Sequence, residues 1–358
     1  MLVSDFDFDL PPELIASEPR ARGTSRLLVV RRATGAIDEH SIRDLPPLCA
    51  PGDRFVANDT RVFPARLVGR RDPSGGAAEC FLVEPVGNGE WEALVHPGQK
   101  LKPGARLVFE DPLRAAGVRI TAEVLERRFF GRRRVRFEIS GADTFDAAVD
   151  ALGHVPLPPY IHREDRPDDR ERYQTVYAES RGSIAAPTAG LHFDEALVAS
   201  LRARQIGWTT ITLHVGYGTF KPIRVEQVEE HEMDSESFTI PEHAAAEIAA
   251  TRAEGGRIVA VGTTSTRALE STATPERTVR PGIGRTSLFI HPADPATGTG
   301  GHTFQVVDAL LTNFHLPRSS LLMLVSAFAG RDLIAEAYRT AISKSFRFYS
   351  YGDAMLIL

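Results

Sequence analysis

The sequence predicts a layered α/β main domain that is interrupted by a small inserted antiparallel β-barrel domain. Its 358 residues exceed what a single typical hydrophobic core holds. Residues 63–153 contain short strands and almost no helices, which is typical of a barrel or sandwich. Residues 1–62 and 154–358 alternate strands with helices, so we expect them to form one discontinuous α/β domain.

Composition and charge exclude several classes of protein. Hydrophobic residues make up 42% and charged residues 25%, which is ordinary for a globular chain. The formal net charge of -5 gives no global attraction to nucleic acid. Cys49 and Cys80 are isolated, so we expect reduced thiols, no disulfide and no bound metal. No apolar run near the amino terminus is long enough for a signal peptide or a membrane span, which predicts a cytoplasmic protein.

A predicted strand at residues 54–57 leads into a polar junction. Asn58, Asp59 and Arg61, with a threonine between them, offer every kind of hydrogen-bond donor and acceptor. Strand ends are where α/β proteins place binding groups, which makes these residues candidates for a ligand site. A turn held by the Asn58 and Asp59 side chains is the alternative.

Six strands are predicted within the inserted domain, separated by Gly-Gly, Gly-Asn-Gly and Pro-Gly turns. We expect them at residues 65–68, 79–83, 91–95, 106–109, 119–124 and 134–139. Arginines and phenylalanines alternate around a Phe-Gly turn in residues 126–138, as in a hairpin with one basic face. That face either contacts phosphate groups or is simply solvated.

The stretch at residues 181–220 predicts a loop, a helix, a strand and a second loop. Each loop mixes glycines with one histidine, His192 in the first and His214 in the second. Glycines let the backbone approach a ligand closely, so both loops are candidates for a site. Alternatively, His192 caps the helix that begins near Asp194, and His214 is a satisfied histidine at a strand end.

Two further strands in the last third of the chain end in polar residues. The strand predicted at residues 257–261 leads into a small-residue loop at 262–266 and then a helix. This loop suits a carboxylate, phosphate or sugar hydroxyl, but a plain capping loop explains it equally well, and no dinucleotide or nucleoside triphosphate motif is present. The strand predicted from residue 306 ends in Thr312, Asn313 and His315.

These strand ends converge in the predicted fold. The carboxyl ends of parallel strands lie along one edge of a sheet, so the four polar junctions can line one cleft. Such a cleft indicates an enzyme. Since the sequence has no nucleophile elbow, HExxH motif or P-loop, its residues favour a metal-free transferase or lyase that uses histidine or carboxylate acid/base chemistry.

Eight segments resemble one family, the S-adenosylmethionine:tRNA ribosyltransferase-isomerases of queuosine biosynthesis, over nearly the whole chain. Two of them, residues 182–193 and 310–317, contain the long and unusual motifs APTAGLHF (186–193) and TNFHLP (312–317). The others are NDTRVFPAR at 58–66, HVPLPPY at 154–160, YQTVY at 173–177, LHVGYGTF at 213–220, VGTTS at 261–265 and SYGDA at 350–354. The resemblance implies an α/β domain interrupted by a β-barrel. It also implies that ribosyl is transferred from S-adenosylmethionine to a deazaguanine at the tRNA wobble position.

The resemblance implies roles for particular residues. We expect His192 and His214 to transfer protons, with His315 in reserve, and we place Asp234 with these catalytic residues. Asp59, Glu232 and Asp234 would hold the substrate amine or ribose hydroxyls, and residues 262–265 the methionine carboxylate or ribose. The full set of expected substrate-binding residues is Asn58, Asp59, Arg61, Thr188, Gly190, Gly216, Gly218, Thr219, Glu232, Thr263, Thr264, Ser265 and Asn313.

The expected partners are S-adenosylmethionine, as a co-substrate, and the anticodon loop of a tRNA. No permanently bound cofactor and no metal are expected, and we expect a monomer. Candidate phosphate contacts are Arg66, Arg70, Arg71, Arg132, Arg133 and Arg134.

Two departures from the family pattern are Asp234, where a second histidine is common, and the Gly/Thr-rich insertion at 293–301. They leave open a paralogue with a different, non-tRNA acceptor, and a non-catalytic RNA-binding protein is the competing class.

Overall fold

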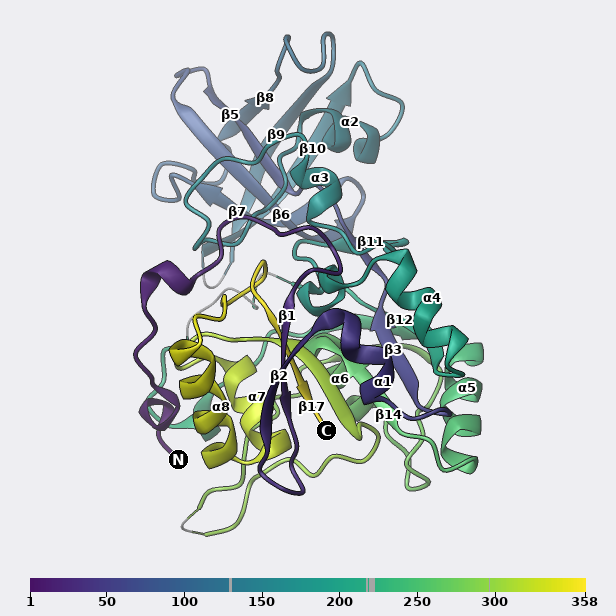
Figure 1. The fold of residues 1–358 in the computed structure, drawn as a ribbon. Coiled ribbons are helices and arrows are strands. Elements are labelled where there is room, and N and C mark those ends of the chain that lie inside the picture. Colours follow the sequence, from purple (N-terminus) through teal and green to yellow (C-terminus); the bar gives the residue numbers. More distant parts are fainter. Residues whose placement is uncertain (129–130, 217, 219–222, 296) are drawn as a thin grey trace. The chain divides into compact units, whose positions relative to one another are not determined.

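The computed structural model describes residues 1–358 except 129–130, 217, 219–222 and 296, and its chain forms two compact units (Figure 1). Unit 1 contains residues 1–61 and 172–358, and unit 2 contains residues 62–171. This α/β domain with an inserted barrel has the fold class that the sequence predicts. Residues 154–171 group with the barrel by their contacts, whereas the sequence-based boundary places them in the α/β domain; that boundary stays a prediction.

A nine-stranded sheet forms the centre of unit 1. Its four middle strands are mutually parallel, and they are, in spatial order, β12 (Gly207–Leu213), β3 (Arg54–Asn58), β14 (Ile258–Val261) and β16 (Ala309–Asn313). Beyond β12 lie β13 (Glu236–Ile240) and β15 (Gly282–Thr286), and beyond β16 lie β17 (Ala354–Ile357), β1 (Arg26–Val30) and β2 (Ile37–Ser41). Because β17 runs antiparallel to β16 and parallel to β1, both β17 and β1 begin at the edge where β16 ends.

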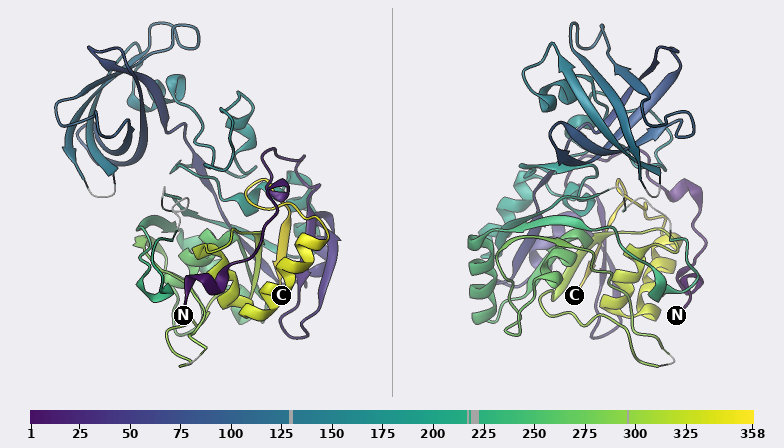
Figure 2. Two further views of the ribbon diagram at one scale, coloured as in Figure 1. Left: turned by 90° about the vertical axis from the view of Figure 1, so that its left-hand side faces the viewer. Right: turned by 180° about the vertical axis from the view of Figure 1, so that it is seen from behind.

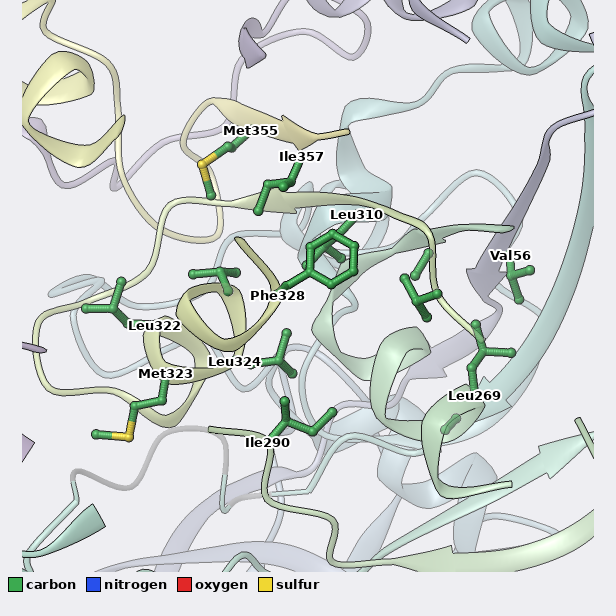
Figure 3. Close-up of a cluster of buried hydrophobic side chains, with 14 of the residues drawn as sticks. Val56, Leu269, Ile290, Leu310, Leu322, Met323, Leu324, Phe328, Met355 and Ile357 are labelled. Atoms are coloured by element: carbon green, nitrogen blue, oxygen red, sulfur yellow. The ribbon is translucent and has the colours of Figure 1, made fainter. Parts of the chain in front are cut away.

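Alternating residues of the strands feed two hydrophobic cores, one on each face of the sheet. Leu27 and Val29 pack with α1 (Leu45–Leu48) and α4 (Glu195–Ala203), whereas Leu28 and Val30 point to the larger core on the other face. Four helices contribute to that larger core: α5 (Glu242–Ala253), α6 (Gly262–Ser271), α7 (Ser320–Ala329) and α8 (Arg331–Ser343). Figure 3 shows side chains from β3, β16, β17, α6 and α7 gathered in it.

Six antiparallel strands close into the barrel of unit 2 (Figure 2). They are β5 (Arg66–Asp72), β6 (Ala77–Gly87), β7 (Glu90–His96), β8 (Arg106–Phe109), β9 (Arg119–Arg127) and β10 (Arg132–Ser140), and β10 pairs with β9 to complete the ring. Helix α2 (Phe145–Leu152) packs on β9 and β10, and α3 (Asp169–Arg172) follows. Short strands β4 (Thr60–Val62) and β11 (Ser180–Ser183) pair separately. The predicted inserted barrel is therefore confirmed.

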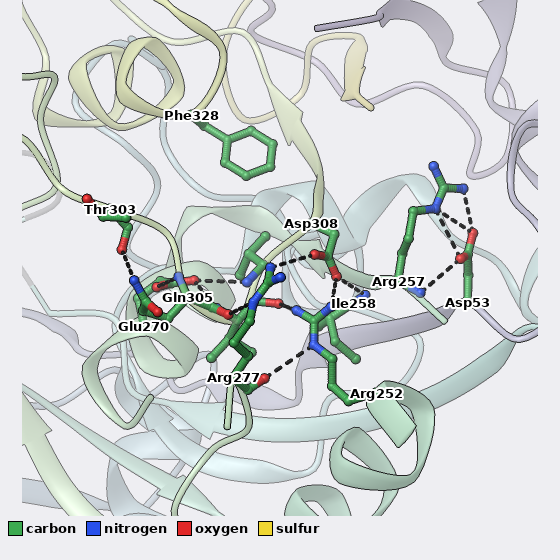
Figure 4. A network of polar contacts seen from close by, with 12 residues as sticks. Asp53, Arg252, Arg257, Ile258, Glu270, Arg277, Thr303, Gln305, Asp308 and Phe328 are labelled. Atoms are coloured by element: carbon green, nitrogen blue, oxygen red, sulfur yellow. Dashed lines mark hydrogen bonds and ion pairs between the residues drawn. The ribbon is translucent and has the colours of Figure 1, made fainter. Parts of the chain in front are cut away.

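Charged residues fix the amino-terminal ends of three central strands (Figure 4). Asp53, just before β3, accepts hydrogen bonds from the backbone N–H and the guanidinium of Arg257, just before β14. Asp308, just before β16, accepts the backbone N–H of Ile258 at 2.8 Å and pairs with Arg252 at 2.5 Å. These bonds hold the strands in register at this edge.

The structure corrects two sequence-based elements. Residues 263–266 are not a loop, because α6 begins directly at Gly262, whose φ of +86° suits glycine at the sharp turn from β14. The strand expected from residue 306 begins at Ala309, so Thr312 and Asn313 are its last two residues. Within the part of the chain that the structure describes, none of the helices is long and apolar enough to span a membrane.

Candidate active site

Four parallel strands bring their carboxyl ends to one edge of the sheet. The register pairs Asn58 of β3 with Ile211 of β12, and Val261 of β14 with Leu311 of β16. The polar junctions that follow these strands therefore lie in one row. Two residues from strand beginnings join the row, since Ser25 precedes β1 and Asp353 precedes β17. The site is thus assembled from the middle of the sheet, where neighbouring strands support each junction.

Asn58 binds the end of the neighbouring strand. Its side chain is fully buried, and its amide nitrogen donates to the Leu213 carbonyl at 2.9 Å. Its amide oxygen accepts the N–H of Leu213 at 3.0 Å and that of Thr60 at 3.1 Å. A fourth contact, 3.3 Å long, reaches the hydroxyl of Thr264 on α6. All of the strong bonding capacity of Asn58 is used inside the protein, so this residue orders the site.

The backbone after β12 is held by side chains from other elements. Val215 donates its N–H to the Ser183 hydroxyl at 2.7 Å, and Gly216 donates its N–H to the Glu236 carboxylate at 2.9 Å. Together with the Leu213 N–H on Asn58, these bonds define a backbone clamp on residues 213–216. Loop N–H groups usually bond to water or to nearby turns, whereas these bonds fix the backbone around His214.

His214 is half-buried at the centre of this clamp. Its Nδ1 lies 2.8 Å from the Thr60 hydroxyl, and its Nε2 makes no hydrogen bond to any residue that the structure describes. Burial lowers the pKa of the imidazole, and the charge of Asp59 partly offsets this effect. Gly182 packs against the ring so closely that a Cβ there would lie 2.6 Å from it. The ring is therefore fixed on one side and available for proton transfer on the other.

His192 is also ordered, but both of its ring nitrogens are occupied. It ends the 3-10 helix η5 (Thr188–His192), and its side chain is buried. The Asn313 amide nitrogen donates to Nε2 at 3.2 Å and to the Tyr349 carbonyl at 3.0 Å, so Nδ1 carries the proton and donates to the Ser25 hydroxyl at 2.7 Å. Burial lowers the pKa of His192 to about 4, so the ring is neutral at physiological pH.

His192 does not cap the following helix. The Asp194 side chain accepts the N–H of Leu197 at 2.8 Å and is the cap of α4. Nearby, Gly190 allows the Tyr177 hydroxyl to approach η5, because a Cβ at this position would lie 2.2 Å from it. Thr188, at the start of η5, is half-buried. Packing against Tyr177 thus explains why residue 190 is a glycine, and its contact with a substrate stays a prediction.

His315 lies in a third polar contact, beyond the end of β16. Its Nε2 is 2.9 Å from the Thr312 hydroxyl, and its backbone N–H donates to the Tyr338 hydroxyl. Burial lowers the pKa of His315 to about 3. The ring is therefore neutral and, like His192, part of an internal network.

Asp59 is a buried carboxyl group beside the clamp. Burial raises its pKa, and hydrogen bonds from neighbouring hydroxyls partly oppose this shift. The strongest of these bonds comes from Thr212, at 2.7 Å. A carboxyl group with a raised pKa exchanges protons closer to neutral pH than an ordinary aspartate, so it suits acid/base work as well as substrate binding.

The first turn of α6 uses part of its hydroxyls internally. Ser265 donates to the Val261 carbonyl at 2.8 Å, so its hydroxyl is already engaged in the helix. Thr263 is buried and Thr264 is half-buried, and Thr264 accepts the contact from Asn58. Thr263 and Thr264 therefore remain candidates for a ligand carboxylate or ribose, whereas Ser265 serves the helix.

The remaining candidates divide by exposure. Asp234 is half-buried beside Gly218, where a Cβ would lie 2.8 Å from its carboxylate oxygen. Gly216 is part of the clamp, and Glu232 and Arg61 are exposed. Thr219 lies outside the described residues. Their roles stay predictions.

Five of the six arginines proposed for phosphate contact lie at or near the surface of the barrel. Four pair with glutamates: Arg66 with Glu79, Arg70 with Glu110, Arg132 with Glu92 and Arg134 with Glu90. The guanidinium of Arg71 packs against Gly76.

Arg133 differs from these five, because it is 3% exposed and donates to the carbonyls of Gly98 and Leu101. It is a structural residue in this arrangement and is not available for a phosphate contact.

Sequence reasoning missed several residues of the site. Thr60 and Ser183 hold His214 and its neighbour, and Ser25 and Asp353 enter from strands that begin at this edge. Thr60 and Asp353 lie within segments that carry the family resemblance, which was the available signal. No local pattern marks Ser25, whose partner is 167 residues away in the chain. Within the described part of the chain, no group of three or more His, Cys, Asp or Glu side chains could hold a metal ion.

Fold and site together define an α/β enzyme with an inserted barrel whose polar site lies at the carboxyl edge of a central parallel sheet. The sequence model of one family, described as "Queuosine biosynthesis protein", matches residues 3–357, and the chain belongs to this family. The resemblance noted from the sequence is confirmed.

Relatives match over their full length. A protein of Symbiobacterium thermophilum is 51% identical over 359 residues and one of Heliobacterium modesticaldum is 49% identical over 360 residues, with 100% of both chains covered in each case. Both are named S-adenosylmethionine:tRNA ribosyltransferase-isomerase. The crystal structure of S-adenosylmethionine tRNA ribosyltransferase from Thermotoga maritima is 36% identical and covers 99% of this chain and 100% of that one, with a TM-score of 0.54.

The buried neutral His192 predicts a loss of stability in mild acid. Because its folded-state pKa is about 4 and the ordinary value is 6.5, the unfolded chain binds the proton first as the pH falls. Between pH 6.5 and pH 4 this site should cost about 3 kcal/mol, at 1.36 kcal/mol for each pKa unit. Urea unfolding across this range should show a smaller loss for His192→Gln than for the wild type.

The matched control is His243→Gln, which replaces an exposed histidine on α5. It should follow the wild-type pH dependence. Equal acid sensitivity of the wild type and His192→Gln would contradict a neutral, buried His192.

Proposed function

We propose that this chain is an S-adenosylmethionine:tRNA ribosyltransferase-isomerase of queuosine biosynthesis. The observation that carries the proposal is the full-length match to relatives of that name, at 51% and 49% identity. The site adds chemical support, because it offers an oriented imidazole, a carboxyl group with a raised pKa and hydroxyl groups at the edge of one sheet.

The proposed reaction needs a base and an acid. The sulfonium of S-adenosylmethionine acidifies the neighbouring ribose C–H bonds, so a base can remove a proton and adenine can leave. The aminomethyl group of the deazaguanine in the tRNA then attacks the sugar, methionine is released, and epoxyqueuosine forms. A histidine serves either proton-transfer step near neutral pH.

Of the histidines proposed for proton transfer, His214 fits that role best. Its Nδ1 is oriented by Thr60 and its Nε2 has no hydrogen-bond partner among the described residues. His192 and His315 have low pKa values, and hydrogen bonds engage the ring of each. We therefore assign His192 and His315 the task of ordering the site, and we keep Asp59 and Asp234 as carboxyl groups that face the substrate.

The proposal also covers the acceptor base, the oligomeric state and the cellular compartment. The acceptor is the wobble base in the anticodon loop, where unstacked bases can enter a cleft. We propose a cytoplasmic monomer that uses S-adenosylmethionine as a co-substrate and holds no permanent cofactor. Neither a different acceptor nor a non-catalytic RNA-binding role gains support from the names of the relatives.

The proposal predicts two products from one reaction. Protein, S-adenosylmethionine and tRNA carrying the aminomethyl-deazaguanine should yield free adenine and an epoxyqueuosine nucleoside in the digested tRNA, both detected by mass spectrometry. Unmodified tRNA is the control and should give neither product. Adenine without modified tRNA would mean a different acceptor, and neither product with tRNA still bound would favour a binding protein.

Replacing His214, the histidine assigned to proton transfer, should abolish most of the turnover. His214→Gln should lower kcat by about 10²- to 10⁴-fold, which is the range for loss of a general acid or base. Gly182→Ala should also lower kcat, because the added Cβ would lie 2.6 Å from the ring and displace it. The measurement is the rate of adenine release at saturating substrates.

Two controls accompany these variants. His243→Gln, on the surface of α5, should keep wild-type kcat, and thermal melts should show that both test variants remain folded. Wild-type turnover in His214→Gln would remove His214 from the mechanism.

Arginines on the barrel hairpin should contribute to tRNA affinity. Arg132→Gln with Arg134→Gln should weaken binding and reduce the slope of log affinity against log salt by about 2, since roughly one counterion is released per phosphate contact. Filter binding between low and physiological salt measures both quantities. The control is Arg339→Gln, an exposed arginine on α8 that also pairs with a glutamate. Unchanged affinity and slope would mean that the hairpin face is only solvated.

A further inference from the structure

A buried ion pair lies next to the site and has no role in the proposed chemistry. Arg267 of α6 and Glu236 at the start of β13 approach to 2.6 Å, and the side chain of each is 4% exposed. The second carboxylate oxygen of Glu236 accepts the Gly216 N–H at 2.9 Å. The guanidinium also donates to the Leu288 carbonyl at 3.1 Å. The pair therefore connects α6, β13 and the backbone clamp on residues 213–216.

Stability alone does not account for this pair. A buried ion pair often adds little net stability, because the desolvation of both charges offsets their attraction. The second terminal nitrogen of Arg267, Nη2, is buried and makes no hydrogen bond to a described residue, which opposes folding further. An apolar pair of similar size would fill the same space without burying two charges, at the cost of the hydrogen bonds to the Gly216 N–H and the Leu288 carbonyl. We therefore attribute to the pair the orientation of the Glu236 carboxylate. Arg267 binds one oxygen of this carboxylate, and the Gly216 N–H binds the other.

The arrangement ties the clamp to α6 at two points. Arg267 acts through Glu236 on Gly216, and Thr264, one turn earlier on α6, accepts the contact from Asn58, which binds Leu213. Side chains therefore connect both ends of the segment that carries His214 to the same helix, α6. A shift of either end would move the imidazole relative to Asp59 and the other groups of the site.

We propose that Arg267 is a positioning residue, which orients Glu236 so that the carboxylate holds the Gly216 N–H and fixes the segment carrying His214. Arg267 itself does not contact the reacting atoms. This inference rests on the proposed function, since it assigns Arg267 a part in the same reaction.

The test separates positioning from stability. The double variant Arg267→Met/Glu236→Leu replaces the pair with apolar side chains of similar size, so relief from burying two charges should offset much of the loss of the Gly216 and Leu288 hydrogen bonds, and the protein should stay folded at the assay temperature. Its kcat for adenine release should fall roughly 100-fold, as expected when a reacting group is displaced by about 1 Å. Its KM for S-adenosylmethionine should change far less than its kcat. Arg267→Lys, which keeps the charge but not the planar fork, should be intermediate.

The chain offers a matched control at the opposite edge of the sheet. Arg252 and Asp308 form a less buried pair, with side chains 15% and 18% exposed, and Asp308 likewise accepts a backbone N–H, that of Ile258. Arg252→Met/Asp308→Leu should change kcat little at temperatures where it is folded. A wild-type kcat in Arg267→Met/Glu236→Leu would overturn the positioning role, as would an equal loss in the control pair.

A readout without turnover distinguishes failure of this inference from failure of the proposed function. In ¹H–¹⁵N spectra of labelled protein, the Gly216 amide proton should move strongly in Arg267→Met, because its carboxylate acceptor loses the group that orients it. An unshifted Gly216 resonance would overturn the inference whatever the wild type does to its substrates. Absence of adenine release by the wild type would instead overturn the proposed function alone.

Discussion

The backbone clamp on residues 213–216 is the constraint on which the rest of the site depends. Side chains from three other elements accept N–H groups of this segment: Asn58 for Leu213, Ser183 for Val215 and Glu236 for Gly216. A segment leaving a strand normally exchanges such bonds with water, and its position varies accordingly. Here the bonds are internal, with those of Leu213 and Val215 buried and that of Gly216 partly buried, so His214 projects from a backbone that is supported on both sides.

The two edges of the sheet differ in what their residues do: those at the amino-terminal edge stabilise the fold, and those at the carboxyl edge form the site. Charged pairs that involve Asp53 and Asp308 hold the amino-terminal ends of the central strands, and burial of apolar side chains on both faces stabilises the middle. The carboxyl edge can then carry polar groups whose pKa values are shifted in opposite directions. Burial lowers the pKa of His214, the histidine assigned to proton transfer, whereas it raises the pKa of Asp59. Such opposed shifts at one edge are what acid/base chemistry requires.

The fold and the polar residues at the strand ends could be predicted from the sequence for physical reasons. Alternating strands and turn residues in 63–153 predict the barrel, and buried strands followed by polar residues predict the row from Asn58 to Asn313. Sequence reasoning failed where partners are distant in the chain. Nothing local links Arg267 to Glu236 or Ser25 to His192. The position of Arg133 could have been inferred, because alternation with buried Val135 and Phe137 places it inside the barrel.

Hydrogen exchange of the amides of residues 213–216 tests the central claim most directly. If the clamp holds, the N–H groups of Leu213, Val215 and Gly216 should exchange as slowly as those in the middle of β12, and opening should need a large part of the global unfolding free energy. Exchange at the rate of an exposed loop, while β12 stays protected, would contradict the account. His214 would then project from a mobile segment, and the site would have to be ordered by its substrates.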